Sequence, residues 1–182
     1  HETRQIRIID FGISTNIPLQ MPSARGVNLL QGTIAFMSPE QTGRINRAID
    51  YRTDIYSLGA TLYTMLTGRP PFDSDDALDV IHGHLARAPQ RPSELVGMPD
   101  VLAEIVMKLL SKDAEDRYQT AAGLLHDLET CERQLRETYS VNNFALATRD
   151  RSARFQMPQR TYGRDAEIKQ LHDGFDRVCA GA

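Results

Sequence analysis

The chain has 182 residues, of which 21 are basic and 24 acidic, so its formal net charge is −3, and 41% of the residues are hydrophobic. This composition is typical of a globular protein and excludes a disordered or fibrous chain. No apolar run approaches the ~20 residues that a membrane-spanning helix needs. The basic residues are too dispersed for a nucleic-acid interface. We therefore expect no membrane segment and no nucleic-acid partner.

The cysteines and histidines give no indication of a disulfide or a metal site. Cys131 and Cys179 lie far apart and neither belongs to a Cys-x-x-Cys pair, which is typical of reduced thiols in a cytoplasmic protein. His82 and His84 are two positions apart in a helical pattern, so they would lie on different faces of the helix. We predict a cytoplasmic protein in which these residues bind no metal.

The first third of the sequence predicts one strand and one long loop. The short β-branched run Ile6–Ile9 is typical of a buried strand, and it leads directly into Asp10-Phe11-Gly12. Between residues 13 and 31 there is no sustained period, and prolines, glycine and small polar residues dominate. A loop of this length usually has a function of its own.

The next part of the sequence predicts a series of helices. Apolar residues recur at helical spacing within 55–66, 78–81, 102–110 and 124–135. The first of these stretches is apolar nearly all round, which predicts a buried helix, and Gly68 should end it. Thr120 is a plausible N-cap for the last. Periodicity then fades until a further amphipathic stretch at 168–178.

Four short motifs stand in a fixed order in the sequence. Asp10-Phe11-Gly12 is followed by Gly32-Thr33 and then by Ser38-Pro39-Glu40; Asp54 opens the apolar helix, and Arg117 follows much later. This order and spacing resemble the C-terminal lobe of a bacterial eukaryotic-type serine/threonine protein kinase, over residues ~4 to ~135. The resemblance implies an α+β protein-kinase-like fold of which only the mainly α-helical C-lobe is present, followed by a helical tail.

The resemblance also implies roles for the residues around the first motif. Asp10 matches the aspartate that binds magnesium, and a carboxylate is a suitable ligand for this hard cation. With Phe11 and Gly12 it would form the cofactor-binding motif, and residues 13–31 would be the activation loop. Thr33 matches the threonine that contacts the catalytic aspartate. ATP and Mg²⁺ would be the cofactors and proteins the substrates.

Three further residues would have structural roles. Glu40 and Arg117 match a pair that forms a buried salt bridge between the substrate-binding segment and the helical subdomain. Because either charge buried alone would be costly, the two should act as a unit. Asp54 matches the aspartate that accepts backbone N–H bonds from the catalytic loop, although an acidic residue is also favoured in any first helical turn.

Several parts of a kinase come before Asp-Phe-Gly in the family: the glycine-rich loop, the ATP-binding lysine and the catalytic loop. Only nine residues precede Asp10 here, and the first lysine is Lys108. We therefore expect an inactive fragment of an active parent kinase. The alternative is a pseudokinase, a regulatory scaffold on the same fold. An independent helical adaptor is disfavoured because it would not need the kinase spacing.

The end of the chain carries a second resemblance. Tyr162-Gly163-Arg164 and the following Glu167 are similar to the lead-in to an ATPase module of the AAA/STAND type. Such modules follow kinases in large bacterial signalling proteins that often continue to histidine-kinase domains. The expected organisation is a kinase C-lobe at 1–136, a linker at 137–160 and the start of the ATPase module at 161–182.

Overall fold

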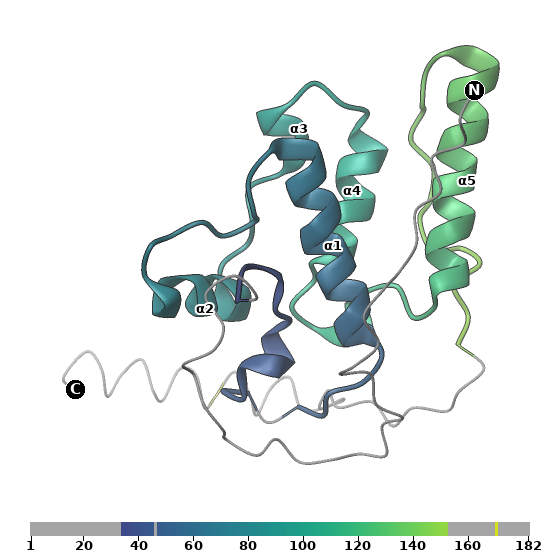
Figure 1. Ribbon diagram of the computed structural model, residues 1–182. Helices are drawn as coiled ribbons and strands as arrows, with labels where there is room; N and C mark the ends of the chain where they lie inside the picture. The colour runs from purple at the N-terminus through teal and green to yellow at the C-terminus, as the bar shows by residue number, and fades with distance from the viewer. Residues whose placement is uncertain (1–33, 46, 153–169, 171–182) are drawn as a thin grey trace, which may run out of the picture. The chain divides into compact units, whose positions relative to one another are not determined.

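The computed structural model describes residues 34–45, 47–152 and 170, and the predicted strand Ile6–Ile9 lies outside them. The chain divides into two compact units, His1–Asp150 and Arg151–Ala182. The description below concerns the first unit. In its described residues all regular secondary structure is helical, with five α-helices and three short 3₁₀-helices joined by irregular segments (Figure 1). None of the helices found there has an apolar stretch long enough to cross a membrane.

The central element is α1, Arg52–Thr67, which packs along α4, Asp100–Leu109 (Figure 1). The two helices approach closely because Gly59 has no side chain: a Cβ placed there would lie 2.6 Å from Leu109 Cβ. Gly68 ends α1 in the left-handed conformation, with φ 78°. Here the expected helix and its glycine stop are confirmed.

The expectation that α1 is buried on nearly all sides is wrong for the fold as described. Tyr56 and Tyr63 are fully enclosed, but Leu58 and Leu66 are 42% and 39% exposed and Met65 is 71% exposed. The reason is that α4 and the other described elements cover only one side of this helix. An apolar stripe on α1 is left open to solvent.

Two more of the expected helices are present, α2, Ala77–Ala86, and α5, Ala121–Thr138. The short helix α3, Pro92–Leu95, is not among those expected. The expected amphipathic stretch at 168–178 lies outside the described residues, apart from residue 170. The side chain of Asp76 caps α2 by accepting a hydrogen bond from Leu78 N. Thr120 caps α5, as its sequence predicts, with Gly123 N donating to Thr120 Oγ1 at 2.9 Å.

The core is divided into three clusters of buried side chains. One joins α1, α4 and α5, a second lies between α1 and α4, and a third fixes α2. The three sets are Ile55, Val101, Ile105, Leu109, Tyr118, Leu124 and Cys131; Tyr56, Ala60, Tyr63, Val106 and Leu110; and Ile34, Phe72, Val80 and Ile81.

Residues 139–150, which we call the return segment, fold back after α5 (Figure 1). Val141, Phe144 and Leu146 pack against the cluster that joins α1, α4 and α5. The backbone N–H of Ala147 donates to Asp127 Oδ2 at 2.8 Å. This stretch has no sequence period, because it is irregular, and its sequence therefore predicts a linker. In the structure it forms part of the first compact unit.

Candidate functional site

The segment Ser38–Gln41 directs the Glu40 side chain into the protein. It forms the 3₁₀-helix η3, Pro39–Thr42, which begins at a proline and ends at Gly43 with φ 66°. The Gln41 side chain reaches back, and its Oε1 accepts a hydrogen bond from Ser38 N at 3.0 Å. This reciprocal capping holds the turn, and Glu40 is only 3% exposed.

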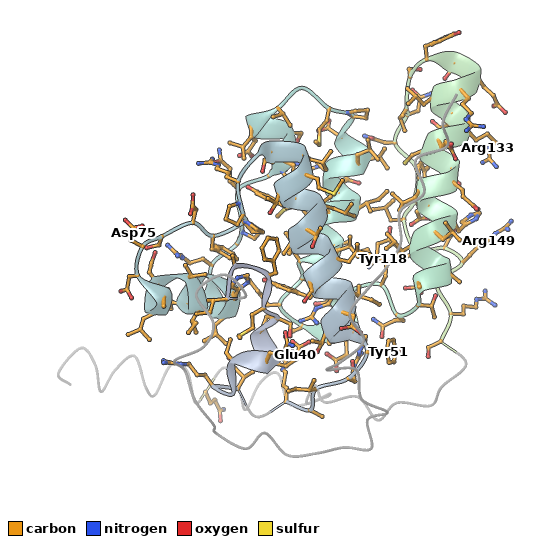
Figure 2. All side chains as sticks on the ribbon, in the orientation of Figure 1. Glu40, Tyr51, Asp75, Tyr118, Arg133 and Arg149 are labelled. Carbon is orange, nitrogen blue, oxygen red and sulfur yellow. The ribbon has the colours of Figure 1, made fainter. Side chains whose placement is uncertain are left out.

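Glu40 meets Arg117, which follows the 3₁₀-helix η4, Ala114–Asp116. The pair is bidentate: Arg117 Nη1 donates to Glu40 Oε1 at 2.7 Å and Nη2 to Oε2 at 2.9 Å. The side chains are 0% and 4% exposed for Arg117 and Glu40. The predicted contact across 77 positions is therefore present, with both charges out of water. Figure 2 shows Glu40 at the foot of α1.

Both residues of the pair also form hydrogen bonds with other groups of the protein. Arg117 donates to three backbone carbonyls, those of Ser111 (2.8 Å), Arg52 (3.1 Å) and Lys112 (3.1 Å). Thr53 Oγ1 donates to Glu40 Oε1 at 2.8 Å. A buried ion pair is tolerated only when its other donors and acceptors are satisfied, and this one meets that condition.

The electrostatic environment keeps Glu40 ionised. Burial would by itself raise the pKa of the carboxyl group, but the hydrogen bonds and positive charge of Arg117 outweigh it and hold the pKa below its usual value. The Arg117 guanidinium also lies over the ring of Tyr56, 4.9 Å from its centroid. Burial strongly raises the pKa of the Tyr56 hydroxyl.

A second polar network lies beside the pair, and sequence reasoning missed it. Arg52 Nη2 bonds to Asp50 Oδ2 at 2.7 Å, and Arg52 Nη1 to Gln119 Oε1 at 3.0 Å. The hydroxyl of Tyr51 donates to Gln119 O at 2.9 Å. Asp150 of the return segment accepts hydrogen bonds from Gln119 N and from Thr120 Oγ1 (2.7 Å). No local pattern identifies partners that are 30 to 68 positions apart.

His84 is a further buried polar residue, and its sequence pattern did not predict a structural role for it. Its side chain is fully buried, and its Nδ1 lies 2.8 Å from the hydroxyl oxygen of Tyr56. Nε2 has no hydrogen bond with a described residue. Burial and the charge of Lys112 lower the pKa of His84 to about 4. The residue is neutral near pH 7 and links α2 to α1.

The other predicted site residues are not brought into this cluster by the structure described. Asp54 lies in the first turn of α1 with an exposed side chain. Asp10, Phe11, Gly12 and Thr33 lie outside the described residues. Among the residues that are described, no group of histidine, cysteine and acidic side chains could hold a metal ion.

Comparison with known proteins decides the family. The family model for the protein kinase domain matches residues 1–128. The chain belongs to the protein kinase domain family. Serine/threonine-protein kinase PknB of Mycobacterium tuberculosis (strain ATCC 25618 / H37Rv) is 39% identical over 127 residues, which cover 69% of this chain and 20% of that protein.

Two relatives are named as histidine kinases. Hybrid signal transduction histidine kinase G of Dictyostelium discoideum is 46% identical over 170 residues, covering 82% of this chain and 5% of that protein. Peroxide stress-activated histidine kinase mak3 of Schizosaccharomyces pombe is 32% identical over 138 residues, covering 76% of this chain and 6% of that protein. This chain therefore spans only a small part of these curated relatives. The likeness to the Dictyostelium protein includes residues beyond the 128 that the family model matches.

Proposed function

We propose that this chain is the C-terminal lobe of a serine/threonine protein kinase, which transfers the γ-phosphate of ATP to serine or threonine hydroxyls of proteins. The observation that carries this proposal is the buried, bidentate Glu40–Arg117 pair, which joins the Ser-Pro-Glu segment to the helical core. The similarity to PknB proteins, named as serine/threonine kinases, supports the choice of acceptor.

In this proposal the residues before the described part supply the chemistry. Bound Mg²⁺-ATP would provide the phosphoryl group, with charge neutralised by the metal. Asp10 would hold the metal through its carboxylate, an oxygen donor of the kind that Mg²⁺ prefers. Phe11 and Gly12 would position that carboxylate, and Thr33 would contact the catalytic aspartate. Asp54 would fix the backbone of the catalytic loop.

The open apolar stripe on α1 supports the view that further parts of the kinase domain pack here. Leu58, Met65 and Leu66 are exposed on a helix that is otherwise the centre of the core. Large apolar side chains that are exposed together usually mark a contact surface. We assign this stripe to contacts with the rest of the kinase domain.

We also propose that the kinase is one module of a multidomain signalling polypeptide. Residues 161–182 would begin an ATPase module of the AAA/STAND type, and histidine-kinase domains would follow. The relatives named as hybrid or peroxide stress-activated histidine kinases support such an arrangement.

The test is phosphoryl transfer by the complete polypeptide and by its Asp10→Ala variant. With radiolabelled ATP and a generic protein acceptor, the variant should lose activity by orders of magnitude, since several kcal/mol of barrier depend on the metal. Its melting temperature should stay near that of the wild type. Asp75→Ala, which changes an exposed aspartate, is the matched control.

The scaffold alternative gives the opposite result. A complete polypeptide that transfers no phosphate, or whose transfer survives Asp10→Ala, would favour a pseudokinase. The 182-residue chain alone should show no transfer above background, because it has no lysine before Lys108 to bind the phosphates of ATP.

A further inference from the structure

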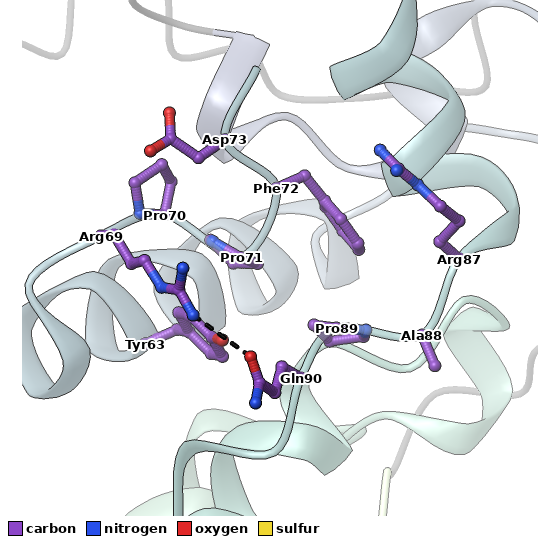
Figure 3. A pocket seen from close by; sticks show the side chains of 10 residues that line it. All are labelled: Tyr63, Arg69, Pro70, Pro71, Phe72, Asp73, Arg87, Ala88, Pro89 and Gln90. Carbon is purple, nitrogen blue, oxygen red and sulfur yellow. Dashed lines mark hydrogen bonds between the residues drawn. The ribbon is translucent and has the colours of Figure 1, made fainter. Parts of the chain in front are cut away.

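A hollow of about 250 Å³ lies where the chain after α1 passes the chain after α2 (Figure 3). It is lined by Tyr63, by Arg69–Asp73 and by Arg87–Gln90. Sites for drug-sized ligands and cofactors usually measure roughly 300–1,000 Å³. This hollow is smaller, so it suits one side-chain group or a small ion rather than a nucleotide.

The floor of the hollow is apolar and fixed in shape. Pro71, Phe72 and Pro89 are buried, and each proline ring fixes its backbone φ. The Phe72 ring is held on several sides: Lys112 Nζ is 4.5 Å from its centroid, and a Cβ placed at Gly83 would lie 2.6 Å from it. Because this surface is already formed, binding a ligand to it would cost little conformational entropy of the protein.

The Tyr63 hydroxyl opens onto this floor without a hydrogen-bond partner among the described residues. The Tyr63 residue is only 1% exposed, and its hydroxyl forms no hydrogen bond with any described residue. Figure 3 shows it directed toward Arg69 and Gln90. Among the described residues the only buried polar side-chain atom without a partner is His84 Nε2, so solvent reaches the Tyr63 hydroxyl oxygen from the hollow. The position opposite it is therefore open for a ligand atom.

The rim beside the hydroxyl offers further donors. Arg69 Nη2 donates to Gln90 Oε1 at 3.2 Å, and no carboxylate of the described residues pairs with Arg69. Most of the five N–H donors of its guanidinium remain for a ligand. The Gln90 amide nitrogen adds two more donors. Across the hollow, Arg87 is paired with Asp79 at 3.2 Å.

One acidic residue also lines the hollow. Figure 3 shows the Asp73 carboxylate at the opposite edge, beyond Pro70 and directed away from Gln90. The corner formed by Tyr63, Arg69 and Gln90 is therefore rich in donors and contains one positive charge. Its acceptors are Gln90 Oε1, which is already bonded to Arg69, and the hydroxyl oxygen of Tyr63, on which the charge of Glu94 also acts. Such a corner favours an anion that accepts several hydrogen bonds.

We propose that this hollow binds the anionic side chain of a protein segment, through a carboxylate or phosphate group that accepts from Tyr63 Oη, Arg69 and Gln90. The apolar floor would contact the aliphatic part of the side chain, which a free inorganic ion lacks. This binding goes beyond the proposed kinase activity and does not depend on it, so the two can fail separately.

The experiment uses the complete 182-residue chain labelled with ¹⁵N and three blocked amino acids as probes. N-acetyl-phosphoserine methylamide and N-acetyl-glutamate methylamide distinguish phosphate from carboxylate, and N-acetyl-glutamine methylamide is the uncharged control. We expect one or both anions to shift the side-chain signals of Arg69 and Gln90 saturably. The glutamine probe should bind at least roughly fivefold more weakly, because it lacks the charge.

Two variants locate the effect. Tyr63→Phe removes only the hydroxyl and should weaken binding without lowering the melting temperature, since that hydroxyl has no partner to lose. Arg69→Gln should abolish saturation, whereas Arg136→Gln, on the exposed face of α5, should change nothing. The proposal is overturned if neither anion saturates, if the glutamine probe binds equally well, or if Arg69→Gln binds like the wild type.

Discussion

The Glu40–Arg117 pair makes a sharp prediction for the stability of the protein. Removing either side chain leaves the other charge buried without its partner, which typically costs roughly 3–5 kcal/mol of unfolding free energy. We expect Glu40→Ala and Arg117→Ala each to be this severe. The double variant should lose much less than their sum, because the two residues share one interaction. Urea denaturation of the four proteins measures the coupling.

The same cycle on Glu132 and Arg136 of α5 is the matched control. This pair is equally short, at 2.6 Å, but its side chains are 59% and 77% exposed. Its coupling should be at most about 1 kcal/mol. Arg117→Lys should also destabilise, because a lysine cannot form the two parallel bonds to Glu40. Equal coupling in the buried and exposed pairs would contradict this account.

Lys112 predicts an unusual dependence of stability on pH. Burial, assisted by the charges of Arg117 and Arg87, lowers the pKa of its amino group to about 7, although its bond to Gly83 O and the Phe72 ring favour the charged form. Between pH 7 and the ordinary lysine pKa near 10.5, the unfolded chain binds a proton that the folded chain has lost. Stability should therefore rise with pH in this window.

The measurement is the urea midpoint from pH 7.0 to 8.0, which stays below the pKa of about 8.5 of a thiol in the unfolded chain. The wild type should become more stable across this interval, and Lys112→Met should remove the rise. Lys108→Met, in the last turn of α4, should keep it. A rise that persists in Lys112→Met would show that another group is responsible.

At the scale of elements, Gly123 tests how the return segment meets α5. A Cβ placed at Gly123 would lie 2.5 Å from Cβ of Asp150 and 2.6 Å from its carboxyl carbon. Alanine is favoured over glycine in a helix by about 1 kcal/mol, but here it would displace Asp150 from Thr120. We expect Gly123→Ala to lower the unfolding free energy by about 1–3 kcal/mol.

Gly97→Ala is the control, because nothing lies within 4 Å of a Cβ at that position. Its effect should stay within about 0.5 kcal/mol. Both variants can be compared by chemical denaturation. If Gly123→Ala instead stabilised the protein, helix propensity would dominate and Asp150 would not be packed against α5.

The helices were predictable because their sequence features are local. Apolar spacing predicts α1, α4 and α5, Gly68 predicts one end, and Thr120 predicts one cap. The exposed stripe on α1 was not predictable in this way. Apolar residues show that a face can be buried, but they do not show which element covers it.

The candidate site was predictable only in part. Glu40 and Arg117 are 77 positions apart, and only the resemblance to kinases connects them. Thr53, Arg52 and Gln119 carry no such pattern, since any polar residue could stand at those positions in the sequence. The hollow at Tyr63 depends on the packing of two separate segments, and composition or period cannot reveal such packing.

At the scale of the whole molecule, the return segment predicts where the kinase unit ends. The compact unit extends to Asp150, and Val141, Phe144 and Leu146 are partly buried against the core. A fully buried side chain of this kind contributes about 1.5–3 kcal/mol. Partial burial of these three side chains, together with the hydrogen bonds of Asp150, should therefore contribute several kcal/mol to the free energy of unfolding. This is a large share of the ~5–15 kcal/mol that stabilises a typical domain.

A chain that ends at Thr138 should therefore have a much lower melting temperature than one that ends at Ser152. Thermal unfolding followed by circular dichroism at 222 nm measures the difference. In the uncut chain, Phe144→Ala should reproduce part of this loss, whereas Asn143→Ala, at an exposed neighbouring position, should not. Equal melting of the two truncated chains would mean that residues 139–150 are a passive linker after all.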